Sequence, residues 1–329
     1  MGQFNGGEAE WTGRAKGMCR HLGRSFALVL LAMSVACSSA GPDGAAGSSD
    51  AVARFTRLAA GTEVVSIHGL PDGRIRYAER AGTVWELDSA DDETPTALVR
   101  LAVDTEDQRG LLGIASTSDG LLFASWVDTN GALLVSQVER GVASTVWTGP
   151  TTAPQANGGH LVLGPGGELI IGIGDLNQGQ QRGRFLQLDP DGAPTQPPVV
   201  LSTGWNNPFA YDITPTGHIW VADNAPREEP ERIGRGDTGA IIGALTIKTA
   251  PAGLAVLGDT DGVTTLAICG YVSRRLDIWR INDNAPKVLP GRPLADDCAT
   301  AVAVLPDGRL AYATVDAVMV TTAPVGTRA

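Results

Sequence analysis

The sequence predicts an all-β fold, a six-bladed β-propeller of four-stranded antiparallel blades, and three observations support this prediction. A tight turn that ends in glycine recurs six times, hydrophobic strands flank every copy, and successive copies are 45 to 50 residues apart. Glycine provides the positive φ that hairpin turns need, and a regular repeat of this length is typical of propeller blades. The aligned glycines are Gly73, Gly120, Gly167, Gly217, Gly262 and Gly308.

The strands can be placed in chain order around these turns. Valine, isoleucine, leucine and aromatic residues flank each turn without the spacing that an amphipathic helix requires. A third strand with a Trp/Phe-x-Leu/Ile pattern follows several of the turns, at 83–88, 184–189 and 277–282. We expect residues 53–59 to form the outer strand of the last blade and so to close the ring. The six turns lie at 70–79, 116–125, 163–172, 213–222, 258–267 and 305–314.

Residues 1–36 have the pattern of an export signal. Arg20 and Arg24 precede an apolar run at 26–37, and small polar residues follow it. The run is too short to cross a bilayer. Met18 is the expected start, because the residues before it carry no export pattern. A buried core helix is the alternative interpretation of the run.

The end of this segment, Ser34-Val35-Ala36-Cys37, resembles a bacterial lipobox, in which the cysteine is lipidated and becomes the new N-terminus. Ser34 stands where leucine is usual, and the same bond also suits an ordinary signal peptidase. The prediction is therefore an exported protein, anchored to a bacterial membrane through a lipid on Cys37, or otherwise periplasmic or secreted. Residues 37–50 would form a flexible tether, and residues 51–329 one propeller domain.

Charge and cysteine content restrict the possible partners. The chain has 36 acidic and 25 basic residues, a net charge of −11, which argues against nucleic acid or anionic lipid as a partner. We expect a monomer whose only membrane contact is the lipid. Cys269 and Cys298 are an even pair in an oxidising compartment, which predicts a disulfide, with two buried thiols as the alternative. The sequence contains no Cys/His cluster of the kind that binds structural zinc.

The stretch QANGGHLVLGPGGELIIGIGD, residues 155–175, carries the candidate site. Its Gly167 is the hairpin glycine that all six repeats share. Asn157-Gly158-Gly159, in contrast, precedes the innermost strand of the third blade, where the other repeats have no glycine pair. That loop would lie on the face of the propeller where ligands bind beside the central channel. These three residues therefore mark a candidate ligand site.

Five blocks in order resemble the quinoprotein glucose/sorbosone dehydrogenases, at 70–88, 106–115, 157–175, 207–233 and 250–259. This resemblance covers nearly the whole mature chain. Members of that family are soluble six-bladed propellers that oxidise aldoses with pyrroloquinoline quinone (PQQ) and calcium. The resemblance implies a sugar ligand and these two cofactors.

The resemblance also assigns the catalytic position, and this sequence departs from the family there. The family's general base is a histidine just before Asn-Gly-Gly, because imidazole titrates near neutral pH. Here that position is Ala156, preceded by Gln155 where an aspartate is usual. His160 is the nearest imidazole and a possible stand-in, although its place on the strand predicts that it points elsewhere.

The cofactor residues depart from the family as well. A tricarboxylate needs fixed positive charge, but the family's arginines fall on Asn206, Cys298 and Thr300, and its lysine falls near Val272. Arg274 is the remaining candidate for binding the cofactor.

For calcium, the resemblance implies ligands at Asn224 and Ala225, with Glu229 as one of several carboxylates near Pro230, where the family has aspartate. A solvated acidic loop is the alternative. The resemblance implies a sugar-binding role for Gln108 and Gln180, with Asn157 and Asn206 as further ligand-binding candidates. Asp175 is expected to accept backbone amides at its turn.

Three functions remain open. The departures favour a non-catalytic family member that binds a small polar ligand or a protein partner. Family resemblance alone favours an active PQQ- and calcium-dependent sugar dehydrogenase with a rearranged site. A calcium-dependent, lactonase-like hydrolase would need several oxygen ligands around one ion, for which Asn157, Asn206 and Asp223 are candidates. No serine-hydrolase or dinucleotide motif is present.

Overall fold

The computed structural model describes residues 54–179, 182–226, 229–245, 248–260, 262–282 and 285–325, which lie in one compact unit. Every regular element in these ranges is a β-strand. None of the described segments is a helix that could span a membrane. The predicted export segment, Cys37 and Gln180 lie outside the described residues, so what the sequence indicates for them stays a prediction.

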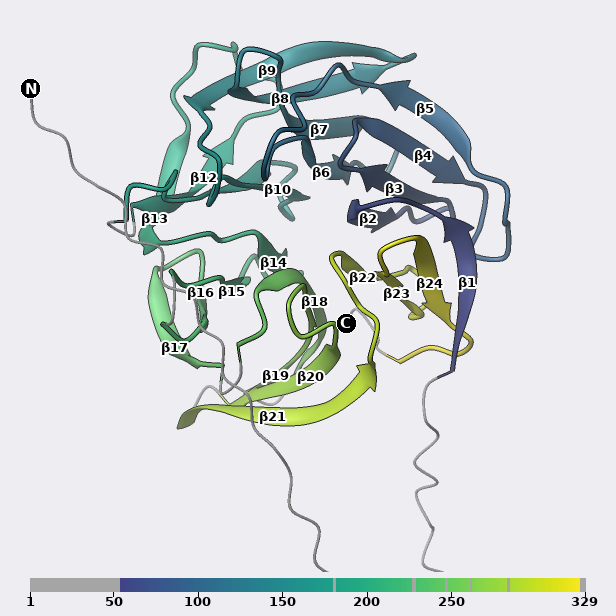
Figure 1. Ribbon diagram of the computed structural model, residues 1–329, viewed down its shortest axis with the longest axis vertical. Coiled ribbons are helices and arrows are strands. Elements are labelled where there is room, and N and C mark those ends of the chain that lie inside the picture. Colours follow the sequence, from purple (N-terminus) through teal and green to yellow (C-terminus); the bar gives the residue numbers. More distant parts are fainter. Residues whose placement is uncertain are drawn as a thin grey trace, which may run out of the picture. The chain divides into compact units, whose positions relative to one another are not determined.

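The described strands form six four-stranded antiparallel sheets, each of which is one blade (Figure 1). Blade 1 consists of β2 (Val64–Gly69), β3 (Ile75–Glu79), β4 (Thr83–Leu87) and β5 (Thr96–Arg100). Blade 2 consists of β6 (Leu111–Ser116), β7 (Leu122–Val127), β8 (Ala132–Glu139) and β9 (Val142–Thr151). Blade 3 consists of β10 (Gly158–Leu163), β11 (Leu169–Ile173), β12 (Gly183–Leu188) and β13 (Val199–Trp205).

The second half of the propeller repeats this order. Blade 4 consists of β14 (Ala210–Ile213), β15 (Ile219–Asp223), β16 (Arg232–Arg235) and β17 (Ala240–Ala244). Blade 5 consists of β18 (Pro251–Thr260), β19 (Val263–Gly270), β20 (Leu276–Asn282) and β21 (Ala285–Ala295). Blade 6 consists of β22 (Val302–Val304), β23 (Leu310–Ala313), β24 (Ala317–Thr321) and β1 (Phe55–Ala60). The predicted six-bladed propeller is therefore confirmed.

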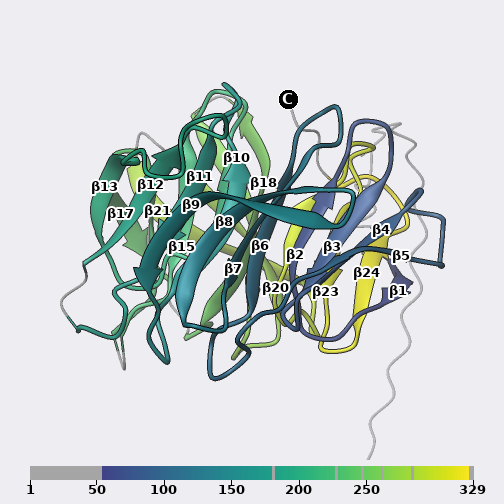
Figure 2. The same ribbon diagram turned by 90° about the horizontal axis from the view of Figure 1, so that it is seen from above.

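The ring closes as the sequence predicts. β1 pairs antiparallel with β24, from Phe55 opposite Thr321 to Ala60 opposite Ala317. The first strand of each blade contacts the first strand of the next, from β2 round to β22 and back to β2. In Figure 2 the strands run between two faces that carry the loops. The six predicted hairpin glycines all have a positive φ, between 71° and 96°.

Hydrophobic clusters join the blades, one at each of the six interfaces between neighbours. Between blades 3 and 4, for example, the ring of Phe185 meets the rings of Trp205 and Tyr211 edge to face, with centroids 5.7 Å and 4.9 Å apart. Strand alternation supplies these side chains, because every second residue faces the next blade. Burial between blades therefore orients the six first strands around the axis.

Polar bonds also cross between blades. Arg76, on β3, is buried and donates to Glu86 at 2.7 Å, to Ser116 Oγ at 2.9 Å and to the Gly120 carbonyl at 2.8 Å, which ties blade 1 to blade 2. Cys269, on β19, forms a disulfide with Cys298, which precedes β22, across a Cα–Cα distance of 5.7 Å. This bond joins blade 5 to blade 6.

Candidate functional site

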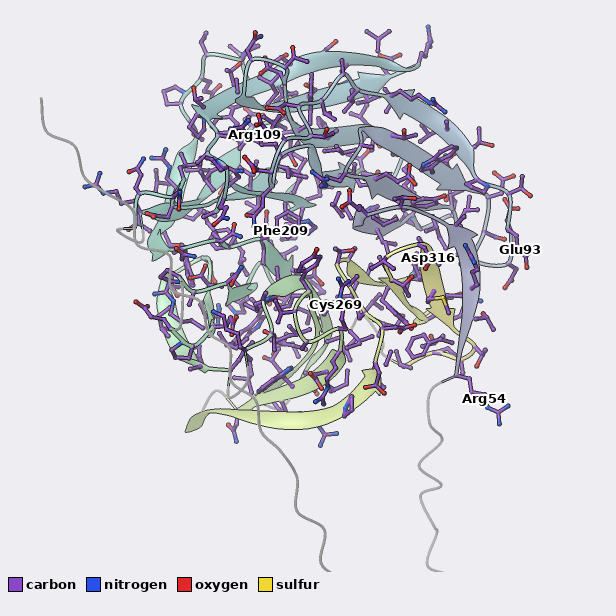
Figure 3. All side chains as sticks on the ribbon, viewed as in Figure 1. Arg54, Glu93, Arg109, Phe209, Cys269 and Asp316 are labelled. Atoms are coloured by element: carbon purple, nitrogen blue, oxygen red, sulfur yellow. A yellow bond between two sulfur atoms is a disulfide. The ribbon has the colours of Figure 1, made fainter. Side chains whose placement is uncertain are left out.

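The loops that precede the first strands of the blades surround a cleft of about 610 Å³ on one face of the propeller. Every blade contributes to its lining, because all six first strands start at this face. Phe209, labelled near the centre of Figure 3, is one of its apolar residues. The polar and aromatic side chains used below come from Arg80, Gln108, Asn157, Asn207, Phe209, Tyr271, Arg274 and Thr300.

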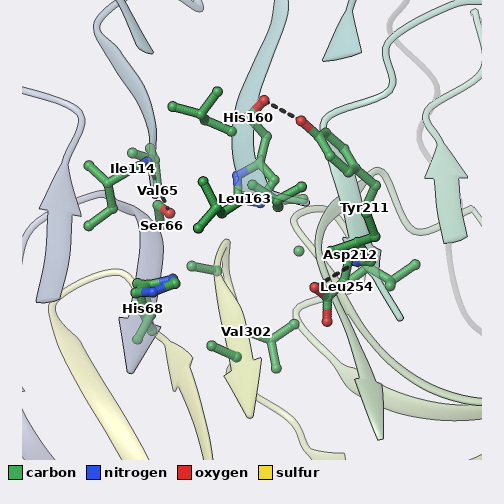
Figure 4. Close-up of a pocket in the computed structure, with 18 residues that line it drawn as sticks. Val65, Ser66, His68, Ile114, His160, Leu163, Tyr211, Asp212, Leu254 and Val302 are labelled. Atoms are coloured by element: carbon green, nitrogen blue, oxygen red, sulfur yellow. Dashed lines mark hydrogen bonds between the residues drawn. The ribbon is translucent and has the colours of Figure 1, made fainter. Parts of the chain in front are cut away.

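A narrower channel of about 80 Å³ lies along the axis between the six first strands. Figure 4 shows His68 on β2 and His160 on β10 at this channel, together with Tyr211 and Asp212 from β14. The Asp212 carboxylate accepts the amide N–H of Ile213 at 2.8 Å and of Val256 at 2.9 Å. Tyr211 donates its hydroxyl to the carbonyls of His160 and Ile170. The channel is thus polar but closely filled.

His160 lines this channel and is not among the described residues that line the cleft. Its Nδ1 is buried and has no hydrogen-bond partner among the described residues. Burial, together with the nearby charge of His68, lowers the pKa of His160 to about 4. An imidazole so placed remains neutral at physiological pH, but it is turned away from a ligand in the cleft.

Ala156 occupies the position where the resemblance places a general base. Its backbone is left-handed, with φ of 55°, its N–H donates to Gln108 Oε1 at 3.2 Å, and its carbonyl accepts the Leu176 N–H at 2.9 Å. A methyl group can neither take nor give a proton. Among the described residues that line the cleft there is no histidine.

The glycine pair after Ala156 allows close backbone packing. Gly158 and Gly159 have φ of 66° and 97°, and a Cβ at these positions would lie 2.3 Å from the Gly172 carbonyl oxygen and 2.4 Å from a Leu112 methyl group. The Gly158 N–H donates to Asn207 Oδ1 at 2.9 Å, which ties blade 3 to blade 4. The pair thus lets the backbone form the wall of the cleft.

The predicted ligand-binding amides have different roles in the structure. Gln108 lines the cleft, although its Oε1 accepts the Ala156 N–H. Asn157 also lines it, but its amide closes a local loop through two 2.8 Å bonds with the backbone of Ala153. Asn206 is buried, is not among the described lining residues, and donates to the Asn224 carbonyl. Its neighbour Asn207, which the sequence did not single out, lines the cleft instead.

Buried carboxylates hold these loops in place by accepting hydrogen bonds from backbone N–H groups. Asp175 accepts the N–H groups of Gly179 and Arg182, as predicted. Asp223 is fully buried, pairs with Arg232 and accepts the N–H groups of Asn206 and Asn207. Of the three candidates for a hydrolase metal site, Asp223 and Asn206 are therefore bonded inside the protein, and only Asn157 reaches the cleft.

The residues present do not fit PQQ. Among the positions that the resemblance assigns to arginine, Asn206 is bonded to Asn224, Cys298 is in the disulfide, and Thr300 donates to the Val64 carbonyl. Arg80 does line the cleft, but Glu63 and three backbone carbonyls bind its guanidinium.

Arg274, in contrast, lies at the cleft as expected, with its guanidinium 4.6 Å from the Tyr271 ring centroid. Its Nη1 has no partner among the described residues. Arg274 therefore stands alone where a tricarboxylate needs several cations.

The residues present do not fit calcium either. Lys248 points its Nζ at the predicted place, 3.5 Å from the Ala225 carbonyl oxygen, 3.3 Å from the Glu229 carbonyl oxygen and 3.3 Å from Glu231 Oε1. The Asn224 carbonyl accepts the amide of Asn206. In the described part of the chain no cluster of three or more His, Cys, Asp or Glu side chains could hold a metal ion.

Fold and cleft together define a six-bladed propeller with a ligand-sized hollow on its axis. The chain belongs to the glucose/sorbosone dehydrogenase family: the family model described as Glucose / Sorbosone dehydrogenase matches residues 62–237, more than half of the chain. No curated protein is detectably similar to it in sequence.

Solved structures show the same fold at low identity. A putative oxidoreductase (glucose dehydrogenase) from Thermus thermophilus superposes with a TM-score of 0.69 and 20% identity, over 82% of this chain and 99% of that one. The PQQ-bound aldose sugar dehydrogenase from Streptomyces coelicolor gives 0.68 and 19%, over 82% and 98%. The soluble aldose sugar dehydrogenase from Escherichia coli gives 0.65 and 18%, over 82% and 99%.

Proposed function

We propose that this protein is a non-catalytic member of its family that binds a small polar ligand in the axial cleft. One observation carries the proposal: the cleft is open and lined from all six blades, but a methyl group, that of Ala156, occupies the position of the general base. Transfer of a hydride from C1 of a sugar requires that the C1 hydroxyl lose its proton to a base as well. Binding requires only the cleft.

The lining defines the ligand class. Tyr271 and Phe209 offer ring surfaces, Gln108 and Asn207 carry amides, and Arg274 has a buried guanidinium nitrogen without a partner among the described residues. A few polar groups around apolar surface are typical of small-molecule sites. The combination suits a sugar-sized polyhydroxylated molecule, with one acidic group placed against Arg274.

The first experiment is a calorimetric titration of the purified protein with PQQ in millimolar calcium, with dye reduction by glucose measured on the same sample. We expect neither binding nor turnover. Tight binding with turnover would instead establish the alternative, an active quinoprotein dehydrogenase. Calcium-dependent hydrolysis of gluconolactone by the same sample would establish the lactonase-like alternative.

Ligand binding is tested by thermal shift with glucose, gluconate and glucuronate. We expect at least one of them to raise the melting temperature of the wild type and not that of Arg274→Met. Arg280→Met, which removes an exposed arginine on β20, is the matched control and should respond like the wild type. Equal responses of all three proteins would place binding elsewhere.

We further propose that the protein is exported and held at a membrane by a lipid on Cys37. The support is the sequence pattern of residues 18–37. Globomycin, which blocks lipoprotein processing, should cause the precursor to accumulate, and Cys37→Ala should release the protein into the soluble fraction. A wild-type protein that is soluble and insensitive to globomycin would indicate ordinary secretion.

A further inference from the structure

Lys248 lies between two blades, where the family resemblance implies a calcium ion. It belongs to the loop between β17 and β18, and its ammonium group contacts the loop that leads from β15 to β16. Its three oxygen neighbours are the carbonyls of Ala225 and Glu229 and the carboxylate of Glu231, at 3.3 to 3.5 Å. All three are hard oxygen donors of the kind that calcium binds.

The carboxylate of Glu231 is the group beside Lys248 that requires a cation. Its side chain is 0% exposed, and its carboxylate accepts the N–H of Ala250 at 3.0 Å and of Thr249 at 3.4 Å. The Glu231 carbonyl accepts the Leu245 N–H at 2.8 Å. A buried carboxylate is costly unless a cation compensates it, and this one anchors the loop whose Ala250 and Pro251 line the cleft.

We propose that the Lys248 ammonium group is a resident cation that does the structural work expected of calcium. It neutralises Glu231 and joins the blade 4 loop to the blade 5 loop, so the cleft keeps its shape without a metal. The three donors of an ammonium group match the three oxygens around it. Removing the ammonium group should uncover a latent site for a divalent cation, formed by the same oxygens.

The competing interpretation is an ordinary surface ion pair. Lys248 is 41% exposed, and exposed pairs contribute little to stability. The two interpretations differ in their response to calcium, because only a site with suitably placed oxygens would accept the ion once the lysine is gone. Arg275 provides a matched control: it is 37% exposed and pairs at 2.7 Å with Asp277, which is 7% exposed, within the neighbouring blade 5.

The test compares the purified wild type, Lys248→Ala and Arg275→Ala by thermal melting and calorimetric titration, in chelator and in millimolar calcium. We expect the wild type to melt at one temperature in both conditions and to bind no calcium. Lys248→Ala should melt lower in chelator, rise by about 3 °C or more in calcium, and bind one ion. Arg275→Ala should melt lower in both conditions.

Two results would overturn the proposal. One is a wild type that calcium stabilises and whose response Glu231→Gln abolishes. The other is a folded Lys248→Ala that binds no calcium. If Lys248→Ala does not fold, Lys248→Ser in calcium-supplemented refolding replaces it, and failure to recover folded protein there also counts against the proposal. The outcome is independent of the ligand proposed above, because neither PQQ nor sugar enters the measurement.

Discussion

Protonation of His160 should limit the stability of this protein in mild acid. In the folded channel, which His160 shares with His68, Tyr211 and Asp212, burial and the charge of His68 lower the pKa of His160 to about 4. Unfolding returns the ring to water, where its pKa is about 6.5. Between these two pH values the unfolded chain therefore binds a proton at His160 that the folded chain does not bind. The stability of the folded state relative to the unfolded state is therefore unaffected by this histidine above about pH 6.5, and it decreases as the pH falls towards about 4.

The size of this effect follows from the two pKa values. A difference of about 2.5 in pKa corresponds to at most about 3.4 kcal/mol. Between about pH 7.5 and about pH 5 the linkage relation gives a loss of about 2 kcal/mol from this one group. Carboxylates also titrate at the acid end of this range, so only a difference between variants isolates the histidine.

Urea unfolding of the wild type and His160→Gln at both pH values measures this difference. Glutamine remains polar and takes up no proton, so the variant should lose about 2 kcal/mol less than the wild type on acidification. His218→Gln, which changes an exposed histidine between β14 and β15, should behave like the wild type. If wild type and His160→Gln lose the same free energy of unfolding on acidification, the His160 ring is not a buried neutral base in the folded protein.

Three further predictions concern the frame of the propeller. Arg76→Met should lower the free energy of unfolding by about 3 kcal/mol, measured in urea, because it removes the hydrogen bonds to the buried Ser116 hydroxyl and to the partly buried Gly120 carbonyl, while Glu86 still pairs with Arg74. Reduction of the Cys269–Cys298 disulfide should slow migration of the protein on a gel and lower its free energy of unfolding by about 3 kcal/mol. Identical bands with and without reductant, together with two titratable thiols, would show that the bond is absent. Gly174→Ala should destabilise far more than Gly258→Ala in thermal melts, since a Cβ at Gly174 would lie 1.9 Å from the Ala156 carbonyl oxygen and one at Gly258 would contact nothing within 4 Å. Similar losses from the two glycine substitutions would contradict this account of the cleft wall.

The features of the fold that could be predicted from the sequence are those that repeat along the chain. The turn glycines recur with the blades, and the strand at 53–59 is needed to complete the sixth sheet, so both follow from periodicity alone. The cysteine pair follows from an even count. The structure adds that β1 begins at Phe55, two residues later than the expected strand.

The details of the cleft did not repeat and were harder to predict. Asn206 and Asn207 are adjacent, and only the backbone path decides which one faces the cleft. Lys248 approaches Glu231 from another blade, a tertiary contact that no local pattern signals. Asn157 has the residue type of a ligand contact, but the Ala153 backbone uses its amide. Residue type indicates what a side chain can do, whereas its partners decide what remains available.

The pairing of β1 with β24 also determines when the molecule can be completed. Phe55 and Thr321 lie at opposite ends of the propeller sequence, and the Thr322 N–H donates to the Arg54 carbonyl at 2.8 Å beside them. Contacts so distant in sequence form late in folding. A ribosome must therefore release the last strand before the first one finds its partner. The sheets of blades 1 to 5 are each built from consecutive strands and can form earlier, so only the sixth sheet has to wait for the end of synthesis.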